Sequence, residues 1–179
     1  MLNRNPFLLN FFKTMQEIKY VPIGTIHTPF KGPINVPIQP SAGRGIKGSV
    51  EVLPQFEEGL EDIEKFSHIT LIYHFHLSRG YSLKVKPYMD ERLRGVFSTR
   101  APARPNAIGI STVRLVKREE NILHVKDMDI VDGTPLLDIK PYVPQFDEAK
   151  IGWLEGNIKK LPHTKDDGRF YMKNGDAMK

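Results

Sequence analysis

The chain has 179 residues, a length that suits one domain with or without a tail. Apolar residues make up 40% of it and charged residues 26%, so it can bury a hydrophobic core and is not a disordered polymer. It contains no cysteine, which excludes a disulfide framework, a zinc–thiolate site and a cysteine nucleophile. No apolar run approaches the roughly 20 residues of a membrane helix, so we expect a cytoplasmic protein without a membrane partner.

Positive charge is concentrated in the middle of the chain. The formal net charge is +5, yet residues 76–118 contain ten basic and only two acidic side chains. A basic segment on an otherwise near-neutral chain favours a polyanionic partner, and nucleic acid is the first candidate. A solvated loop without any partner would have the same composition, so charge alone does not decide between the two.

Short strands dominate the predicted elements, because most runs alternate or are β-branched and end at proline or glycine. In chain order the predicted strands are 20–27, 49–53, 69–76, 95–99, 108–116, 122–130 and 136–139, with 117–121 as a hairpin loop. Helical signals are limited to short helices within 54–66 and a glycine-weakened one at 148–161. The pattern predicts a mainly β fold with short helices and loops, either a small barrel or a sandwich rather than a doubly wound α/β fold.

The same pattern predicts the domain organisation. Residues 1–14 look foreign to the rest and form an N-terminal extension, with Met15 as an alternative start. Their apolar run is short and lacks the small-residue cleavage site of a signal peptide. Residues 15–146 form the mainly β domain in this prediction, and residues 147–179 form a partly helical C-terminal tail.

Two motifs suggest functions that their context disfavours. Residues 43–48 spell G-x-G-x-x-G, but a proline-rich loop precedes them and a strand follows, whereas dinucleotide binding needs a strand before and a helix after. We therefore expect a flexible loop. On one continuous strand, His68, His74 and His76 would project from the same face and could ligate a metal. No carboxylate shares the pattern and Phe66-Ser67 could interrupt the strand, so we expect no metal site.

Two other segments carry more specific chemistry. In 99–109, two prolines stiffen a loop that presents Arg100, Arg104 and Asn106. Fixed guanidinium groups suit a carboxylate, a phosphate or a base edge, although an arginine can also tie its own loop to backbone carbonyls. The second segment, 129–142, contains the turn sequence Asp132-Gly133-Thr134-Pro135, whose amides and carboxylate could hold a ligand.

A longer set of residues runs in order from Lys19 to Pro144. It comprises Ile23-Gly24-Thr25-Ile26-His27-Thr28-Pro29-Phe30, Gln39-Pro40, Gly59-Leu60, Phe66-Ser67-His68-Ile69, Phe75-His76, Gly95-Val96-Phe97-Ser98-Thr99-Arg100, Arg104-Pro105-Asn106, Ile108-Gly109, Asp132-Gly133-Thr134-Pro135 and Asp138-Ile139-Lys140-Pro141-Tyr142. In content and spacing this set resembles the TrmO family, also called the YaeB or VirR family. The short region after Pro144 resembles the archaeal-type form, which lacks the second domain of many bacterial members. Ala107 stands where members often have proline.

The resemblance implies a tRNA (adenine-N6)-methyltransferase that uses S-adenosylmethionine. It also implies the fold, which would be a small single β-barrel with short helices and loops, without a Rossmann fold or a knot. Family members methylate N6 of N6-threonylcarbamoyladenosine beside the anticodon, and they form homodimers with the cofactor near the subunit interface. The expected partners are therefore tRNA, S-adenosylmethionine and a second copy of the chain.

The resemblance also implies site residues. The cofactor site would comprise Pro40, Ser41, Ala42, His76, Leu77, Arg100, Ile110, Asp132, Gly133, Thr134, Pro135 and Leu136. Residues that would bind tRNA are Lys84, Lys86, Arg92, Arg94, Arg104 and Asn106. Asp132 or His76 could act as a general base, although cofactor binding suits either equally well. Arg100 could bind the carboxylate of the cofactor or that of the threonyl substituent, and core packing is the alternative role for Ile110 and Leu136.

Two other functions remain open at this point. One is an S-adenosylmethionine-binding RNA module that transfers no methyl group. The other is a metal hydrolase built on the histidines.

Overall fold

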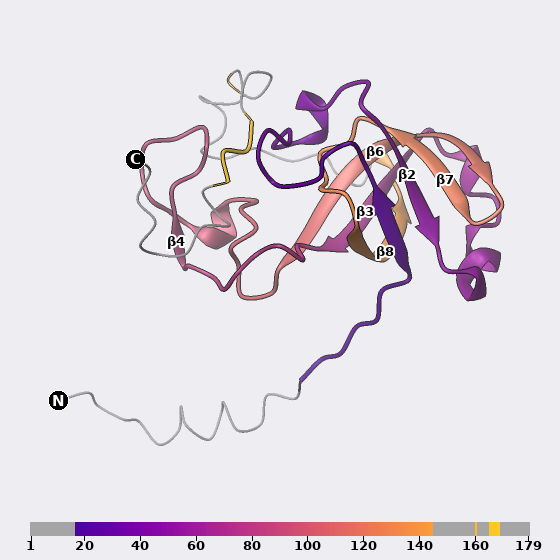
Figure 1. Cartoon of the computed structure of the whole chain (residues 1–179), viewed down its shortest axis with the longest axis horizontal. Helices are drawn as coiled ribbons and strands as arrows, with labels where there is room; N and C mark the ends of the chain where they lie inside the picture. The colour runs from indigo at the N-terminus through magenta and orange to yellow at the C-terminus, as the bar shows by residue number, and fades with distance from the viewer. Residues whose placement is uncertain (1–16, 145–159, 161–164, 169–179) are drawn as a thin grey trace.

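Six antiparallel strands form a closed barrel in the computed structural model, which describes residues 17–144, 160 and 165–168 (Figure 1). Around the barrel the strand order is β1-β2-β7-β6-β3-β8, and β8 pairs again with β1. The strands are β1 (Gly24–His27), β2 (Lys47–Val52), β3 (His68–His74), β6 (Ile108–Glu119), β7 (Ile122–Lys126) and β8 (Thr134–Pro141). This confirms the predicted fold class, and the six strands overlap six of the seven predicted ones.

The barrel forms because alternate side chains of each strand are apolar and meet inside it. On β3, Ile69, Leu71 and Tyr73 are buried while the residues between them are not. Val113 on β6 and Leu123 on β7 are likewise fully buried. Burying a large aliphatic side chain stabilises a fold by about 1.5–3 kcal/mol, so this shared interior determines which face of each strand points inward.

Gly24 allows the barrel to close. It pairs with Val52 on one side and with Leu136 on the other. A Cβ atom at this position would collide with the backbone carbonyl of Glu51. Only glycine therefore lets β1 approach β2 this closely while also pairing with β8.

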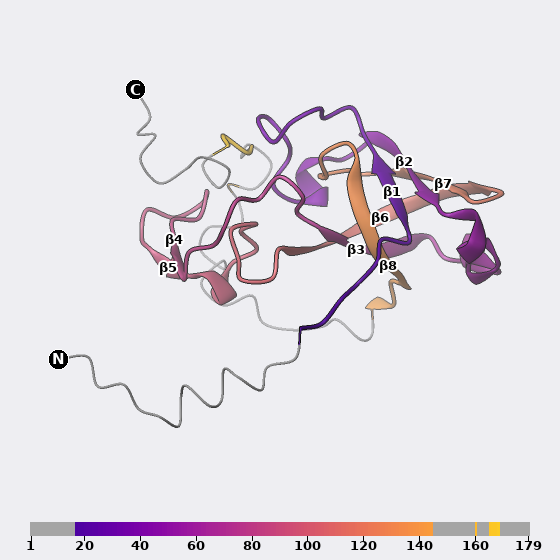
Figure 2. The same ribbon diagram turned by 60° about the horizontal axis from the view of Figure 1, so that its bottom comes forward.

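Residues 77–107 leave the barrel between β3 and β6 and form a separate lobe, seen on the left of Figures 1 and 2. The lobe contains β4 (Lys84–Val85), β5 (Arg94–Gly95) and the 3-10 turn η4 (Val96–Ser98). A small core of Val85, Val96 and Ala101 lies inside it. The predicted strand at 95–99 is wrong, because the Ser98 and Thr99 hydroxyls donate to carbonyls three residues earlier and turn the chain.

Short 3-10 helices complete the described elements: η1 (Pro40–Ala42), η2 (Pro54–Leu60) and η3 (Ile63–Lys65). The last two confirm the short helices predicted within 54–66. Residues 1–14 and, apart from Lys160, the predicted helix at 148–161 lie outside the described residues. In the part of the chain that the structure describes, no helix is long and apolar enough to cross a membrane.

Residues 165–168 lie against the loop that leads into η1. Lys165 forms a β-bridge with Pro37, and Asp166 exchanges backbone hydrogen bonds with Asn35 and Val36 at 2.7 and 2.8 Å. The Tyr88 hydroxyl of the lobe donates to the Asp166 carboxylate at 2.5 Å. Residues 165–168 thus connect the η1 loop to the lobe. The η1 loop and the lobe both contribute residues to the candidate site.

Candidate functional site

Loops that are distant in sequence meet at one end of the barrel. Arg100, which follows η4 in the lobe, donates from Nη1 to Oε1 of Gln39 at 3.0 Å. Gln39 is the residue before η1, so this bond joins the proline-stiffened loop to the expected cofactor loop. His76, just beyond the end of β3, lies with Nδ1 3.3 Å from Oγ1 of Thr134. The structure therefore places two predicted site residues, His76 and Thr134, in contact, and it brings a third, Arg100, against the residue that precedes the predicted η1 residues.

Asp132 is held by the loop that follows β1. Its Oδ1 accepts from the Thr28 amide at 2.9 Å, and its Oδ2 accepts from Lys31 Nζ at 2.7 Å. The hydrogen bond from Lys31, with that from Thr28, lowers the pKa of the carboxyl group below its ordinary value. Gly133, with φ near +74°, completes the turn, and its amide bonds to the Ile26 carbonyl. These contacts make Asp132 a weak proton acceptor and a good anchor for the turn.

His76 stays neutral more readily than an ordinary histidine. Partial burial lowers the pKa of its ring, and the neighbouring charge of His74 lowers it further. A neutral imidazole can donate from one nitrogen and accept at the other. His76 can therefore hydrogen-bond to a ligand while it contacts Thr134.

Sequence reasoning missed Asp129, which lies in the loop between β7 and β8. The residue is partly buried as a whole, but its Oδ1 is shielded from solvent and accepts no hydrogen bond from any described residue. Burial raises the pKa of this carboxyl group to about 7, against the opposing effects of a hydrogen bond from Ser111 and of the Arg100 charge. The sequence signal was weak, because Asp129 is one of several acidic residues beside the 132–135 turn.

Ser111 links Asp129 to the interior of the barrel. Its Oγ lies 3.0 Å from the Tyr73 hydroxyl, and both side chains are buried. Tyr73 can approach because its neighbour on β6 is Gly109, where a Cβ atom would collide with the Tyr73 ring. A row of polar groups therefore runs from Tyr73 through Ser111 to Asp129, with Arg100 nearby.

The two arginines of the stiffened loop have different roles. Arg104 donates from Nη1 to the carbonyls of Thr99 and Ala101, at 3.0 and 3.1 Å, and so ties its own loop. Arg100 reaches across to Gln39 instead. The loop-tying role that the sequence left open for either arginine therefore belongs to Arg104.

The apolar members of the predicted cofactor site differ in exposure. The Leu136 side chain is fully buried in the barrel core, which is the alternative role considered for it. Ile110 points outward from β6 and is 49% exposed, so core packing does not explain it. Leu77 is partly buried, and no residue of η1 is buried. Ile110 and the η1 loop are therefore available to a ligand. The Leu136 side chain is not available, because it is buried.

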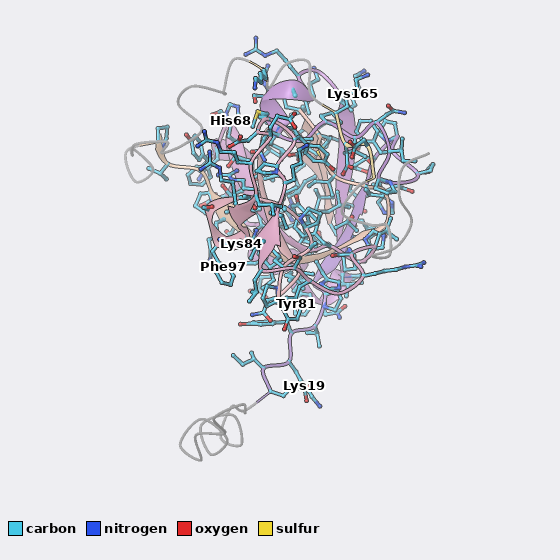
Figure 3. The ribbon with its side chains drawn as sticks, turned by 90° about the vertical axis from the view of Figure 1, so that its left-hand side faces the viewer. Lys19, His68, Tyr81, Lys84, Phe97 and Lys165 are labelled. Carbon is cyan, nitrogen blue, oxygen red and sulfur yellow. The ribbon has the colours of Figure 1, made fainter. Side chains whose placement is uncertain are left out.

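Several predicted tRNA-binding residues lie on the lobe. Figure 3 shows the lobe face, with the exposed residues Tyr81, Lys84 and Phe97 labelled. Some of the basic side chains already contact acidic neighbours: Lys86 pairs with Glu91, and Arg94 donates to Asp90. Lys84, Arg92 and Asn106 are exposed.

The histidines and the glycine motif occupy different parts of the described structure. His68 and His74 point outward from β3, whereas His76 lies beyond the strand end. Among residues 17–144, 160 and 165–168, no three His, Cys, Asp or Glu side chains lie together in a way that could hold a metal ion. Gly43 ends η1, and the chain then turns directly into β2 without a helix. The dinucleotide interpretation of this motif is therefore excluded.

Comparisons with known proteins agree with this geometry. Residues 25–148 match the family model described as the tRNA-methyltransferase O N-terminal domain. The chain is 63% identical over 160 residues to a probable S-adenosyl-L-methionine-binding protein of Pyrococcus abyssi, covering 88% of this chain and 87% of that protein. It is 36% identical over 136 residues to the mouse tRNA (adenine(37)-N6)-methyltransferase, covering 72% of this chain but only 32% of the mouse protein.

A solved structure has the same fold. The crystal structure of TrmO from Pseudomonas aeruginosa matches with a TM-score of 0.64 and 38% identity, over 77% of this chain and 63% of that one. The chain thus spans less than two thirds of that protein. Because the family model covers more than half of the sequence, and because both the sequence and the fold match its members, this chain belongs to the TrmO family.

Proposed function

We propose that this chain is an S-adenosylmethionine-dependent methyltransferase that methylates N6 of N6-threonylcarbamoyladenosine next to the tRNA anticodon. Membership of the TrmO family supports methyl transfer to tRNA. The names of its archaeal relatives support S-adenosylmethionine as the cofactor, and the name of the mouse relative supports the adenine N6 position. The structural observation that carries the proposal is the Arg100–Gln39 hydrogen bond, which joins the rigid arginine loop to the η1 loop.

The residues at this end of the barrel fit such a cofactor. A guanidinium has five N–H donors, and Arg100 uses one of them on Gln39, so others can bind a carboxylate. Ile110 offers exposed apolar surface to an adenine ring. When bound, the cofactor supplies an electrophilic methyl group on a sulfonium.

The protein contributes mainly by holding the reacting groups in line. Methyl transfer is an in-line displacement, so its rate depends on keeping donor and acceptor close and collinear. Arg100 would orient a carboxylate, and the anchored 132–134 turn would hold its backbone amides in fixed positions. His76, which contacts Thr134, would orient the adenosine through its neutral ring.

We also propose that two copies of the chain form a homodimer. Large apolar side chains stand exposed on the lobe, among them Phe97 at 75%, Leu93 at 67% and Tyr81 at 62% exposure. Exposed apolar surface of this kind commonly marks a protein interface. A second copy could also complete a pocket large enough for a cofactor and a modified base.

The function is tested with matched tRNA substrates. Purified protein is incubated with methyl-labelled S-adenosylmethionine and tRNA that either carries or lacks the threonylcarbamoyl group. We expect label in the modified tRNA alone. Binding of cofactor and tRNA without any label transfer would support the RNA-binding module instead. Hydrolysis that requires an added metal would support the hydrolase.

A further inference from the structure

Asp129 has an unusual environment that no role assigned so far explains. A buried carboxyl oxygen normally accepts a hydrogen bond, because leaving it unpaired is costly. Asp129 Oδ1 accepts none from the described residues. Its surroundings are nevertheless polar, with the Ser111 hydroxyl on the carboxyl group and the Arg100 charge nearby. Such a site is built for a donor that arrives with a ligand.

The other acids and bases at this end of the barrel are less suited to accept a proton. Asp132 already accepts from Thr28 and Lys31, and these bonds would have to weaken on protonation. His76 already contacts Thr134 and lies close to the charge of His74. Of these three residues, only Asp129 has a carboxyl oxygen that is shielded from solvent and receives no hydrogen bond from any described residue.

We propose that Asp129 is the catalytic proton acceptor: its Oδ1 takes the N6 proton during methyl transfer, while Ser111 and Arg100 orient the carboxylate. The inference rests on the proposed function and names the base for that reaction. It differs from sequence reasoning, which nominated Asp132 or His76.

The transfer is balanced in atoms and charge. The N6 nitrogen forms the new N–CH₃ bond, and the S–CH₃ bond breaks with its electron pair left on sulfur. The N6–H bond also breaks; its electron pair stays on nitrogen, and its proton passes to Asp129. A sulfonium and a carboxylate are thereby converted into a neutral thioether and a neutral carboxylic acid. The acid then loses its proton to solvent when the product leaves.

The proton affinity of Asp129 suits this step. Burial raises the pKa of its carboxyl group to about 7, whereas Ser111 and Arg100 oppose the increase. The charged or titratable groups that face it, within the described residues, are the Arg100 guanidinium and, through Ser111, the Tyr73 phenol. A general base is most effective when its pKa lies near the working pH. The raised pKa therefore places Asp129 closer to the working pH than an ordinary aspartate, as a general base requires.

The test uses Asp129→Asn, which keeps the shape of the side chain but removes its basicity. Asp62→Asn is the matched control, because Asp62 is exposed just before η3 and its positive φ of 65° suits asparagine. Single-turnover methyl transfer is measured against pH, and cofactor affinity is measured by calorimetry. Carboxyl-carbon NMR of the cofactor-free protein follows the titration of Asp129 without relying on activity.

We expect Asp129→Asn to slow methyl transfer by roughly 10²- to 10⁴-fold, the usual contribution of a general base, with unchanged cofactor affinity. The wild-type rate should rise with pH to a plateau, with a midpoint near the pKa from NMR, and this rise should be absent in the variant. Ser111→Ala removes a hydrogen bond that lowers the pKa, so it should shift the midpoint upward. Asp62→Asn should match the wild type.

Three results would overturn the inference. Equal loss of cofactor affinity and rate would make Asp129 a cofactor-binding residue. An unchanged rate and pH profile in Asp129→Asn, with an active wild type, would reject the base while leaving the proposed function intact. A wild type that methylates no threonylcarbamoylated tRNA would reject both. If Asp129→Asn does not fold, an unshifted midpoint in Ser111→Ala would itself contradict the proposal.

Discussion

Arg100 and Gln39 are 61 residues apart in the sequence, yet the Arg100 Nη1 donates to the Gln39 Oε1 at 3.0 Å. Arg100 belongs to the lobe and Gln39 to the loop that enters the barrel at β2. The bond therefore sets the position of the lobe relative to the barrel at the point where the cofactor is expected.

Arg100→Ala should reduce cofactor affinity or turnover far more than stability. A hydrogen bond to a charged group contributes about 1.5–3 kcal/mol, and a loss of that size corresponds to roughly 10- to 150-fold in binding or rate. Calorimetry, steady-state kinetics and melting temperature should be measured on the same variant, with exposed Lys65→Ala as a control. Normal affinity and turnover would remove Arg100 from the site.

Arg104→Ala should show the opposite pattern. The guanidinium holds the carbonyls of Thr99 and Ala101 in a partly buried loop. Removing these charge-assisted bonds should lower the free energy of unfolding by about 1–3 kcal/mol. Urea denaturation measures this change directly. A variant with wild-type stability but weaker tRNA binding would show that Arg104 contacts phosphate instead.

Asp129 should make stability depend on pH in an unusual direction. Its carboxyl pKa is raised from the ordinary 3.8 to about 7 in the folded protein. Between these values the folded state binds more protons than the unfolded state, so stability from this site falls as pH rises and is constant above about 7. Three pKa units correspond to roughly 4 kcal/mol, and water entry into the site will reduce that figure.

Asp129→Asn should therefore be more stable than the wild type at pH 8 and close to it at pH 4. Thermal melts of both proteins across this pH range would measure the difference in their stability. The other titrating groups are the same in both proteins, so their contributions cancel in that difference. A stability difference between variant and wild type that does not grow as the pH rises would mean that Asp129 has an ordinary pKa.

Lys84→Ala should weaken tRNA binding without affecting cofactor affinity. Lys84 is exposed on β4 of the lobe, where phosphates can reach it. Each phosphate contact changes the slope of log K against log salt by about 0.9, so the variant should lose about one unit of slope. Binding isotherms at several salt concentrations test this. An unchanged slope would place the tRNA on another surface.

The barrel could be predicted from the sequence because several of its strands, β3 above all, alternate between buried and more exposed residues. Leu71 and Val113 mark inward positions that period-two patterning identifies. The segment 95–99 has similar β-branched content but turns into η4, since the Ser98 and Thr99 hydroxyls bond locally to the backbone. Composition does not reveal that competition.

The candidate site was predictable only in part. The short motifs around Arg100 and Asp132 marked it, but Asp129 escaped notice because its character comes from burial and from Ser111, eighteen positions earlier. The different partners of Arg100 and Arg104 were equally invisible, because both arginines lie in the same proline-rich loop. Tertiary contacts, which no local pattern records, decide both cases.

The most direct test of the account is the position of the transferred methyl group. Threonylcarbamoylated tRNA is incubated with the protein and S-adenosylmethionine that carries a deuterated methyl group, then digested to nucleosides for mass spectrometry. The account predicts that the deuterated methyl appears on N6 of N6-threonylcarbamoyladenosine and is absent from tRNA that lacks this modification. Label on another nucleoside, or no label from protein that binds both substrates, would contradict it.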